Sequence, residues 1–337
     1  MSSIDRQAPP LRGYVIAFVS TAIWSASAVF ISYLTTHFRM PPMPLAFWRD
    51  FFVTCTLALA LTVVARPLLQ LERAHVPFFV LYGFVLAIFN SLWTVSVALN
   101  GAALATLLIY FSPAFTAFIG WRWLGERLTS AKLVAIGLSL VGCVLASGAH
   151  DPSAWRVNAI GILAGLGTGM AFAFYSLLGK VSSRKGISPW TATLYAFAIG
   201  SAFLLLLQRP ATFFWLSRPL AAGPGGLREA IHGWGTMLLL AIGPTLGGYG
   251  LYTVSLVYLP TATANLIVTL EPAMTAALAY LFLGEWLTAT QLLGGAIVLG
   301  AVFLLRYSER EAELISGTGG PSPHWAADPE SKQTDQG

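Results

Sequence analysis

Residues 255–288, SLVYLPTATANLIVTLEPAMTAALAYLFLGEWLT, align without gaps to residues 96–129, SVALNGAALATLLIYFSPAFTAFIGWRWLGERLT, at an offset of 159. Thirteen of the 34 aligned positions are identical, among them Pro113/Pro272 and Glu126/Glu285. Apolar helices share Leu and Ala by chance, so the blocks P-A-x-T-A and L-G-E-x-L-T at identical spacing are the stronger evidence. The chain therefore contains an internal repeat.

Composition indicates the solvent around this repeat. Of 337 residues, 56% are apolar and 10% are charged, and the mean hydropathy is +0.71. Soluble domains carry about 25% charged residues, so most of this chain cannot face water. We predict an all-α integral membrane protein with ten transmembrane helices. The predicted segments are 12–34, 43–65, 76–98, 101–123, 130–148, 159–180, 190–207, 234–256, 261–283 and 288–306.

Five segments fall in each copy of the repeat. Because five is odd, the second copy must cross the membrane in the opposite direction, which gives two inverted five-helix repeats. We expect the first repeat at 12–148 and the second at 159–306. Polar tails are expected at 1–11 and 307–337, the second disordered. The longest loop is expected at 208–233.

The positions of Lys and Arg predict the orientation. With the N-terminus in the cytoplasm, twelve basic residues lie inside and five outside, so both termini are expected in the cytoplasm. The inner residues are Arg6, Arg12, Arg66, Arg73, Arg122, Arg127, Lys132, Lys180, Arg184, Lys185, Arg306 and Arg310, and the outer ones are Arg39, Arg156, Arg209, Arg218 and Arg228. Arg127 of LGERLT is then inside, and Trp286 of LGEWLT, at the same motif position, is outside.

At this point the chain resembles a known family. The five-helix duplication and the paired P-x(11)-L-G-E-x-L-T blocks are similar to the drug/metabolite transporter superfamily, in its ten-helix EamA-type permeases, over roughly residues 12–306. Arg49, in PLAFWRDFF, also stands where such permeases often carry Arg. The resemblance implies a permease or exporter in the cytoplasmic (inner) membrane, moving a small metabolite such as an amino acid or drug-like solute. One departure is that repeat one has Ser112 where repeat two has Glu271.

Glu271 and three prolines mark the expected pathway. Glu271 lies near the middle of its segment, where a carboxylate facing lipid costs about 2.5 kcal/mol or more, so it must face a cavity, find a partner or stay protonated. Pro272 frees the carbonyl of Val268, and Pro113 and Pro244 act likewise on their own helices. Such carbonyls are tolerated where they line a cavity or meet another helix. A kink that serves packing, and a Glu271 that fixes helix register, are the alternatives.

Other polar and aromatic residues at mid-depth are further pathway candidates. They are Trp24, Asn90, Trp93, Tyr110, Tyr175, Tyr249, Tyr252 and Asn265, of which Asn90 and Trp93 align with Tyr249 and Tyr252 at the offset of 159. Arg49 and Asp50 are consecutive and therefore about 100° apart on a helix, so nothing requires them to pair, and Asp50 can snorkel to an interface. At the helix ends, we expect Thr129 and Thr288 to be N-caps.

Two classes of function follow. The first is a secondary transporter that works by alternating access, as a monomer or homodimer, with a small-molecule substrate, membrane lipid around it and proton coupling through Glu271. The second is an intramembrane enzyme acting on lipid or peptide, which would need a His, a Cys or paired acids inside the membrane. No His lies in the ten segments, and Cys55 and Cys143 have no paired spacing. We therefore expect a transporter without catalytic residues, cofactor, metal or nucleic-acid partner.

Overall fold

The computed structural model describes residues 11–100, 105, 108–126, 128–147, 151, 158–207, 227–283 and 288–316. Within these ranges the regular structure is entirely helical. The α-helices are α1 (Leu11–Ser25), α2 (Ser27–Thr36), α3 (Pro42–Val64), α4 (Val76–Asn100), α6 (Ser112–Ile119), α7 (Ser130–Ala146), α8 (Ala159–Arg184), α9 (Pro189–Leu207), α12 (Leu227–Leu240), α13 (Gly248–Tyr258), α14 (Thr261–Val268), α15 (Glu271–Leu283) and α16 (Ala289–Ser316). Short helices are η1 (Arg66–Leu69) and η2 (Arg73–His75), and π-helical turns are η3 (Gly120–Leu124) and η5 (Ala241–Gly247).

The surface of the bundle is apolar. Large side chains such as Leu59 (68% exposed), Val63 (80%) and Leu206 (79%) point away from it. In the part of the chain that is described, seven helices are long and apolar enough to cross a membrane. A soluble protein would bury these side chains, so the protein is a multi-pass membrane protein.

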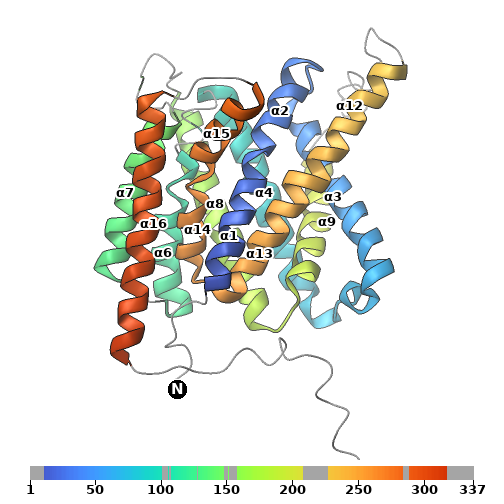
Figure 1. Cartoon of the computed structure of the whole chain (residues 1–337). Helices are drawn as coiled ribbons and strands as arrows, with labels where there is room; N and C mark the ends of the chain where they lie inside the picture. The colour runs from blue at the N-terminus through green and yellow to red at the C-terminus, as the bar shows by residue number, and fades with distance from the viewer. Residues whose placement is uncertain are drawn as a thin grey trace, which may run out of the picture.

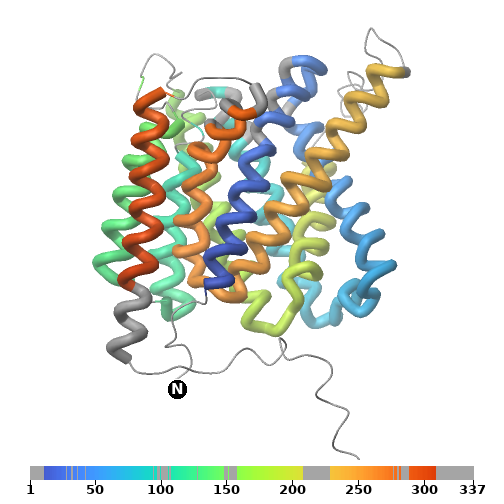
Figure 2. The backbone as a smooth tube through the Cα atoms, in the orientation of Figure 1, coloured from blue at the N-terminus to red at the C-terminus, as the bar shows by residue number. Residues whose placement is uncertain are grey.

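The helices pack as an upright bundle (Figure 1). α7 packs against α16, α4 against α8 and α9, and α1 against α13. α12, η5 and α13 run as one continuous rod that crosses the bundle diagonally (Figure 2). α1 begins and α16 ends at the same end of the bundle (Figure 1).

The proline-bearing segments are interrupted helices. α14 ends at Val268, a turn at Thr269 and Leu270 follows, and Pro272 lies in the first turn of α15. In the same way Pro113 lies in the first turn of α6, after a turn at Tyr110 and Phe111. A proline in the first helical turn loses no intrahelical bond, because its missing N–H would have no partner there. The chain thus changes helix at both places.

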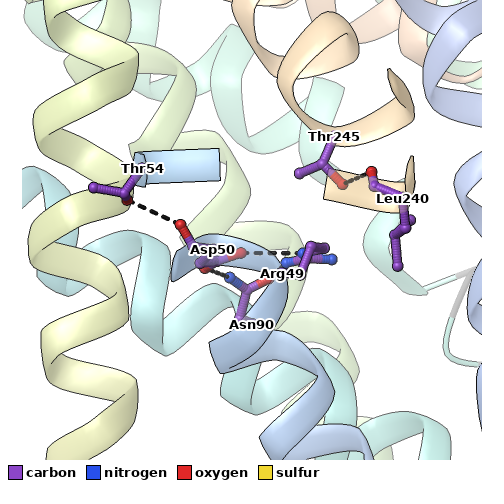
Figure 3. A network of polar contacts seen from close by, with 6 residues as sticks. All are labelled: Arg49, Asp50, Thr54, Asn90, Leu240 and Thr245. Carbon is purple, nitrogen blue, oxygen red and sulfur yellow. Dashed lines mark hydrogen bonds and ion pairs between the residues drawn. The ribbon is translucent and has the colours of Figure 1, made fainter. Parts of the chain in front are cut away.

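Pro244 lies inside η5, where the helix continues. The carbonyl of Leu240, four residues earlier, accepts a hydrogen bond of 2.8 Å from the Thr245 hydroxyl (Figure 3). In a π-helical turn each carbonyl pairs with the N–H five residues on, so the Leu240 carbonyl bypasses Pro244 and pairs with the Thr245 N–H, and the Thr245 hydroxyl is a second donor to it.

Two expected boundaries are wrong. α16 continues through Ser316, so residues 307–316 are helical and not part of a disordered tail. α12 begins at Leu227, so residues 227–233 are helical and not loop. Both stretches mix polar with apolar residues, so the search for apolar runs ended early although the helix goes on. Arg127, Glu285 and Trp286 lie outside the described residues.

Candidate functional site

Arg49, Asp50 and Asn90 form a closed ring of hydrogen bonds between α3 and α4 (Figure 3). Arg49 Nε donates to Asp50 Oδ1 (3.0 Å), and Arg49 Nη2 donates to Asn90 Oδ1 (2.8 Å). Asn90 Nδ2 donates in turn to Asp50 Oδ2 (2.8 Å). All three side chains are buried, and Asp50 is 0% exposed.

The ring corrects two expectations about consecutive charges. Arg49 and Asp50 do pair, and Asp50 does not snorkel to an interface. The angle of about 100° between consecutive residues describes where side chains leave the helix, whereas the long Arg49 side chain folds back to its neighbour. Burying both charges in apolar surroundings is costly unless each is fully hydrogen-bonded, and Asn90 supplies one donor and one acceptor for that purpose.

Glu271 lies at the break between α14 and α15, facing the break before α6. The Tyr110 hydroxyl donates to Glu271 Oε2 at 3.3 Å. Tyr110 is buried and Glu271 is half-buried. The two interrupted segments thus meet through a carboxylate and a phenol, contributed by aligned stretches of the repeat.

Thr269, in the turn between α14 and α15, is hydrogen-bonded to α7. The Cys143 thiol donates to the Thr269 carbonyl (3.3 Å), and the hydroxyls of Ser139 and Thr269 lie 3.0 Å apart. These contacts satisfy polar groups that water cannot reach inside a membrane.

Aromatic rings from α1, α8 and α13 pack together beside these groups. The ring of Trp24 lies 4.1 Å from Tyr249 and 6.0 Å from Tyr252, measured between centroids. Tyr175 meets Tyr249 edge-on at 5.8 Å, and Phe172 lies 5.8 Å from Trp24. Tyr249 lies on α13, which continues from η5, and η5 packs against α3. The aromatic cluster therefore lies beside the helix that carries Arg49 and Asp50.

Asn265, on α14, is the centre of a second group of buried polar side chains. Its Oδ1 accepts from the hydroxyls of Ser176 (3.1 Å) and Tyr252, and the Tyr252 hydroxyl also lies 2.6 Å from Ser176 Oγ. Within the described chain, Asn265 Nδ2 is buried without a hydrogen-bond partner. This amide nitrogen is available to a bound water or a polar solute.

The structure thus brings most of the candidate residues into one part of the bundle, which we call the central region. Of the predicted residues it comprises Trp24, Arg49, Asn90, Tyr110, Tyr175, Tyr249, Tyr252, Asn265 and Glu271. Trp93 lies on α4 one turn from Asn90 and is half-buried. Asp50, Phe172 and Ser176 belong to the region but were not among the predicted pathway residues. The usable signal for Asp50 was that a carboxylate inside an apolar span needs a partner, whereas Ser176 carries no such signal. No cluster of three or more His, Cys, Asp or Glu that could hold a metal occurs among the described residues.

Comparisons with known proteins agree with this picture. The sequence model of the EamA-like transporter family matches residues 11–148 and again 159–307. The threonine/homoserine exporter RhtA of Escherichia coli K12 is 30% identical over 241 residues, which are 69% of this chain and 73% of the exporter. A transporter of Archaeoglobus fulgidus is 29% identical over 223 residues, 65% of this chain and 74% of that protein. A crystal structure with 18% identity shares the fold, with a TM-score of 0.70 over 89% of this chain and 98% of that one.

Proposed function

This chain belongs to the EamA-like transporter family, and we propose that it moves a small amino-acid-like solute across the cytoplasmic membrane by alternating access. The observation that carries the proposal is the central region, where a half-buried carboxylate, an aromatic cluster and a buried guanidinium gather among apolar helices. Polar groups of this kind inside a membrane bundle mark a solute pathway.

The chemistry of the region suits a zwitterion. An ammonium group is attracted by the Glu271 carboxylate and by the faces of Trp24 and Tyr249. A carboxylate is attracted by Arg49, whose guanidinium is held in place by Asp50 and Asn90. The relative named a threonine/homoserine exporter supports an amino acid as the solute class.

We assign ten spans to two inverted repeats, at 12–148 and 159–306. The pairing of helices supports this assignment, because α4 packs on α8 while α13, which aligns with α4, packs on α1, which aligns with α8. In Figure 1, α6 lies in the lower half of the bundle and its counterpart α15 in the upper half. The family model also matches each half separately.

We place both termini in the cytoplasm. The twelve-to-five division of Lys and Arg supports this orientation. The position of the start of α1 and the end of α16 at one end of the bundle is consistent with it (Figure 1). Protons are proposed as the coupling ion, with Glu271 as the group that takes up and releases them.

The test is transport by the purified protein in proteoliposomes. Radiolabelled amino acids, the amines that lack their carboxylate and the acids that lack their ammonium group are offered one at a time. We expect exchange of one or more zwitterions and at least tenfold weaker competition by the single-charge analogues, the loss of about 1.4 kcal/mol or more of binding. Liposomes without protein give the background. Absence of transport for the whole panel, together with turnover of a lipid or peptide, would favour the intramembrane enzyme.

A further inference from the structure

The L-G-E block of the first repeat reaches across the bundle to the second. Glu126, in the turn between η3 and α7, accepts two hydrogen bonds from Thr261, the first residue of α14. Its Oε1 lies 2.9 Å from the Thr261 backbone nitrogen and 2.8 Å from the Thr261 hydroxyl oxygen. The carboxylate satisfies an N–H that has no partner within the helix, and it lies at the positive end of the helix dipole.

Two basic side chains of α8 hold the turns on either side of this contact. Lys180 Nζ donates to the carbonyl of Leu259 (2.9 Å), and Arg184 Nη1 donates to the carbonyl of Leu124 (3.0 Å). Lys180 and Arg184 are four residues apart and so share one face of α8. The turn before α14 and the turn before Glu126 are therefore fastened to the same helix.

These contacts lie at the end of the bundle where the chain begins. The guanidinium of Arg12, near the start of α1, lies over the ring of Tyr258, the last residue of α13, at 4.4 Å. α14 starts three residues later and leads from this end to the central region. All eight of its residues are buried, and Asn265 is one of them. A movement of α14 would thus open a route from this end to the pathway.

The contact is also poised to break. The second carboxylate oxygen of Glu126, Oε2, is buried and has no hydrogen-bond partner in the described chain. A Cβ added at Gly120 would lie 2.9 Å from it, which shows how closely η3 covers it. An unpaired buried carboxylate oxygen disfavours the closed arrangement, and hydration on opening would relieve it. The two bonds to Thr261 act in the opposite direction.

We propose that Glu126 is a latch that closes the transport pathway at the end where the chain begins. With both bonds to Thr261 made, α14 seals this end, and when they break, α14 moves and the end opens. The proposal rests on the alternating access proposed above, and it gives the L-G-E block of the first repeat a role that the central region does not supply.

The test measures access to α14 and needs no substrate. Ala264, which is 0% exposed on α14, is replaced by Cys in a chain that carries Cys55→Ser and Cys143→Ser. Labelling by a membrane-impermeant maleimide is followed in right-side-out and inverted vesicles. Exposed Ser130, at the start of α7, is replaced by Cys in a second chain to identify the side on which the Glu126 turn lies.

We expect Glu126→Ala to raise the labelling rate of Ala264→Cys several-fold, and only from the side that labels Ser130→Cys. Thr261→Val removes one of the two bonds and should raise the rate less, whereas Thr261→Ser keeps the hydroxyl and should leave it unchanged. In the double variant Glu126→Ala with Thr261→Val, the rate should equal that of Glu126→Ala alone.

Thr129→Ala is the matched control. Thr129 lies in the same turn and caps α7 by accepting from the Lys132 backbone N–H (3.2 Å), but it does not contact α14 through this bond. If Thr129→Ala raises labelling as much as Glu126→Ala, or if Glu126→Ala and Thr261→Val both leave it unchanged, the latch is wrong. A failed transport assay would leave this result standing, so the two proposals fail separately.

Discussion

Arg49 and Asp50 form a buried ion pair, and neither charge can stay buried without the other. Either residue alone would place an uncompensated ion among apolar helices, at a cost of about 3–5 kcal/mol. In the ring with Asn90 the two charges compensate each other, both Asp50 oxygens accept a hydrogen bond, and Arg49 uses two of its five N–H donors. We therefore expect stability to depend on the pair, whereas the solute binding proposed above depends on Arg49.

Variants of the pair separate these two roles. We expect Asp50→Asn to lower the free energy of unfolding by about 3 kcal/mol or more, because it leaves the buried guanidinium unpaired. Adding Arg49→Gln should restore most of that stability while transport stays lost. Thermal unfolding in detergent and exchange in proteoliposomes measure the two properties. Transport that returns with stability would make Arg49 a structural residue only.

Glu271 is the residue expected to carry the coupling proton. Glu271→Gln keeps the shape of the side chain and an oxygen that can accept from Tyr110, but it cannot release a proton. We expect the variant to lose accumulation driven by an imposed pH gradient and to retain exchange of preloaded solute. The measurement compares both modes in the same proteoliposomes, with Tyr110→Phe as the control that keeps the carboxylate. Identical responses of Glu271→Gln and the parent protein to the pH gradient would contradict the coupling role.

The sequence allowed a site residue to be predicted when burying its side chain in a membrane costs much free energy. Glu271, Asn90 and Asn265 could be identified because a polar group at mid-span needs a reason to be there. The pairing of Arg49 with Asp50 could not, because helix geometry alone ignores how far a long side chain reaches. Ser176 was missed since a serine can bond to its own helix, as its contact with the Phe172 carbonyl shows (2.8 Å).

At the scale of helices, the prolines have different consequences. Pro113 and Pro272 each lie in the first turn of a new helix. Pro244 lies within a helix that continues, because a π-helical turn pairs the Leu240 carbonyl with the N–H of Thr245 in place of the N–H that Pro244 lacks, and the Thr245 hydroxyl adds a second donor. The position of each proline could be read from the sequence. Whether the helix stops could not, since it depends on whether the backbone around the proline can change to the wider π-helical pairing.

Thr245→Val tests the contribution of the hydroxyl. The Leu240 carbonyl would keep the backbone N–H of the π-helical turn and lose its second donor, at an expected cost of about 0.5–1.5 kcal/mol. Pro244→Ala supplies a backbone N–H that can bond to the same carbonyl, so the double variant should regain a large part of the loss. Thermal unfolding in detergent measures both changes. Equal stability of Thr245→Val and the parent protein would show that the carbonyl needs no second donor.

Element boundaries show where hydropathy is informative about helices and where it is not. Apolar runs locate the membrane-depth parts of α3, α4, α8 and α9 within a few residues, because lipid excludes polar residues there. Beyond that depth a helix can continue in polar sequence, as α16 does to Ser316. Thr129 and Thr288 were correctly predicted as caps: each hydroxyl accepts a backbone N–H three residues on, at 3.2 Å.

At the scale of the whole molecule, polar side chains lie inside and apolar side chains outside, the reverse of a soluble protein. Among the described residues, buried hydroxyls, amides and the ion pair of Arg49 and Asp50 lie inside the bundle, while large apolar side chains cover its surface. The central region draws on both repeats, with Trp24, Asn90 and Tyr110 from the first and Tyr249, Asn265 and Glu271 from the second. A site shared by two inverted repeats can face either side of the membrane when one repeat moves against the other.

The inverted arrangement makes a sharp prediction about two equivalent positions. Ser130 and Ala289 are related by the offset of 159, begin α7 and α16 respectively, and are both exposed. If the repeats are inverted, Ser130→Cys and Ala289→Cys must lie on opposite sides of the membrane, Ser130→Cys in the cytoplasm. Each is introduced into a chain with Cys55→Ser and Cys143→Ser and labelled in intact cells with an impermeant maleimide. Only Ala289→Cys should react, and Ser130→Cys should react after permeabilisation. Labelling of both from one side would show that the two copies run in the same direction, and a pathway shared between inverted halves would then be impossible.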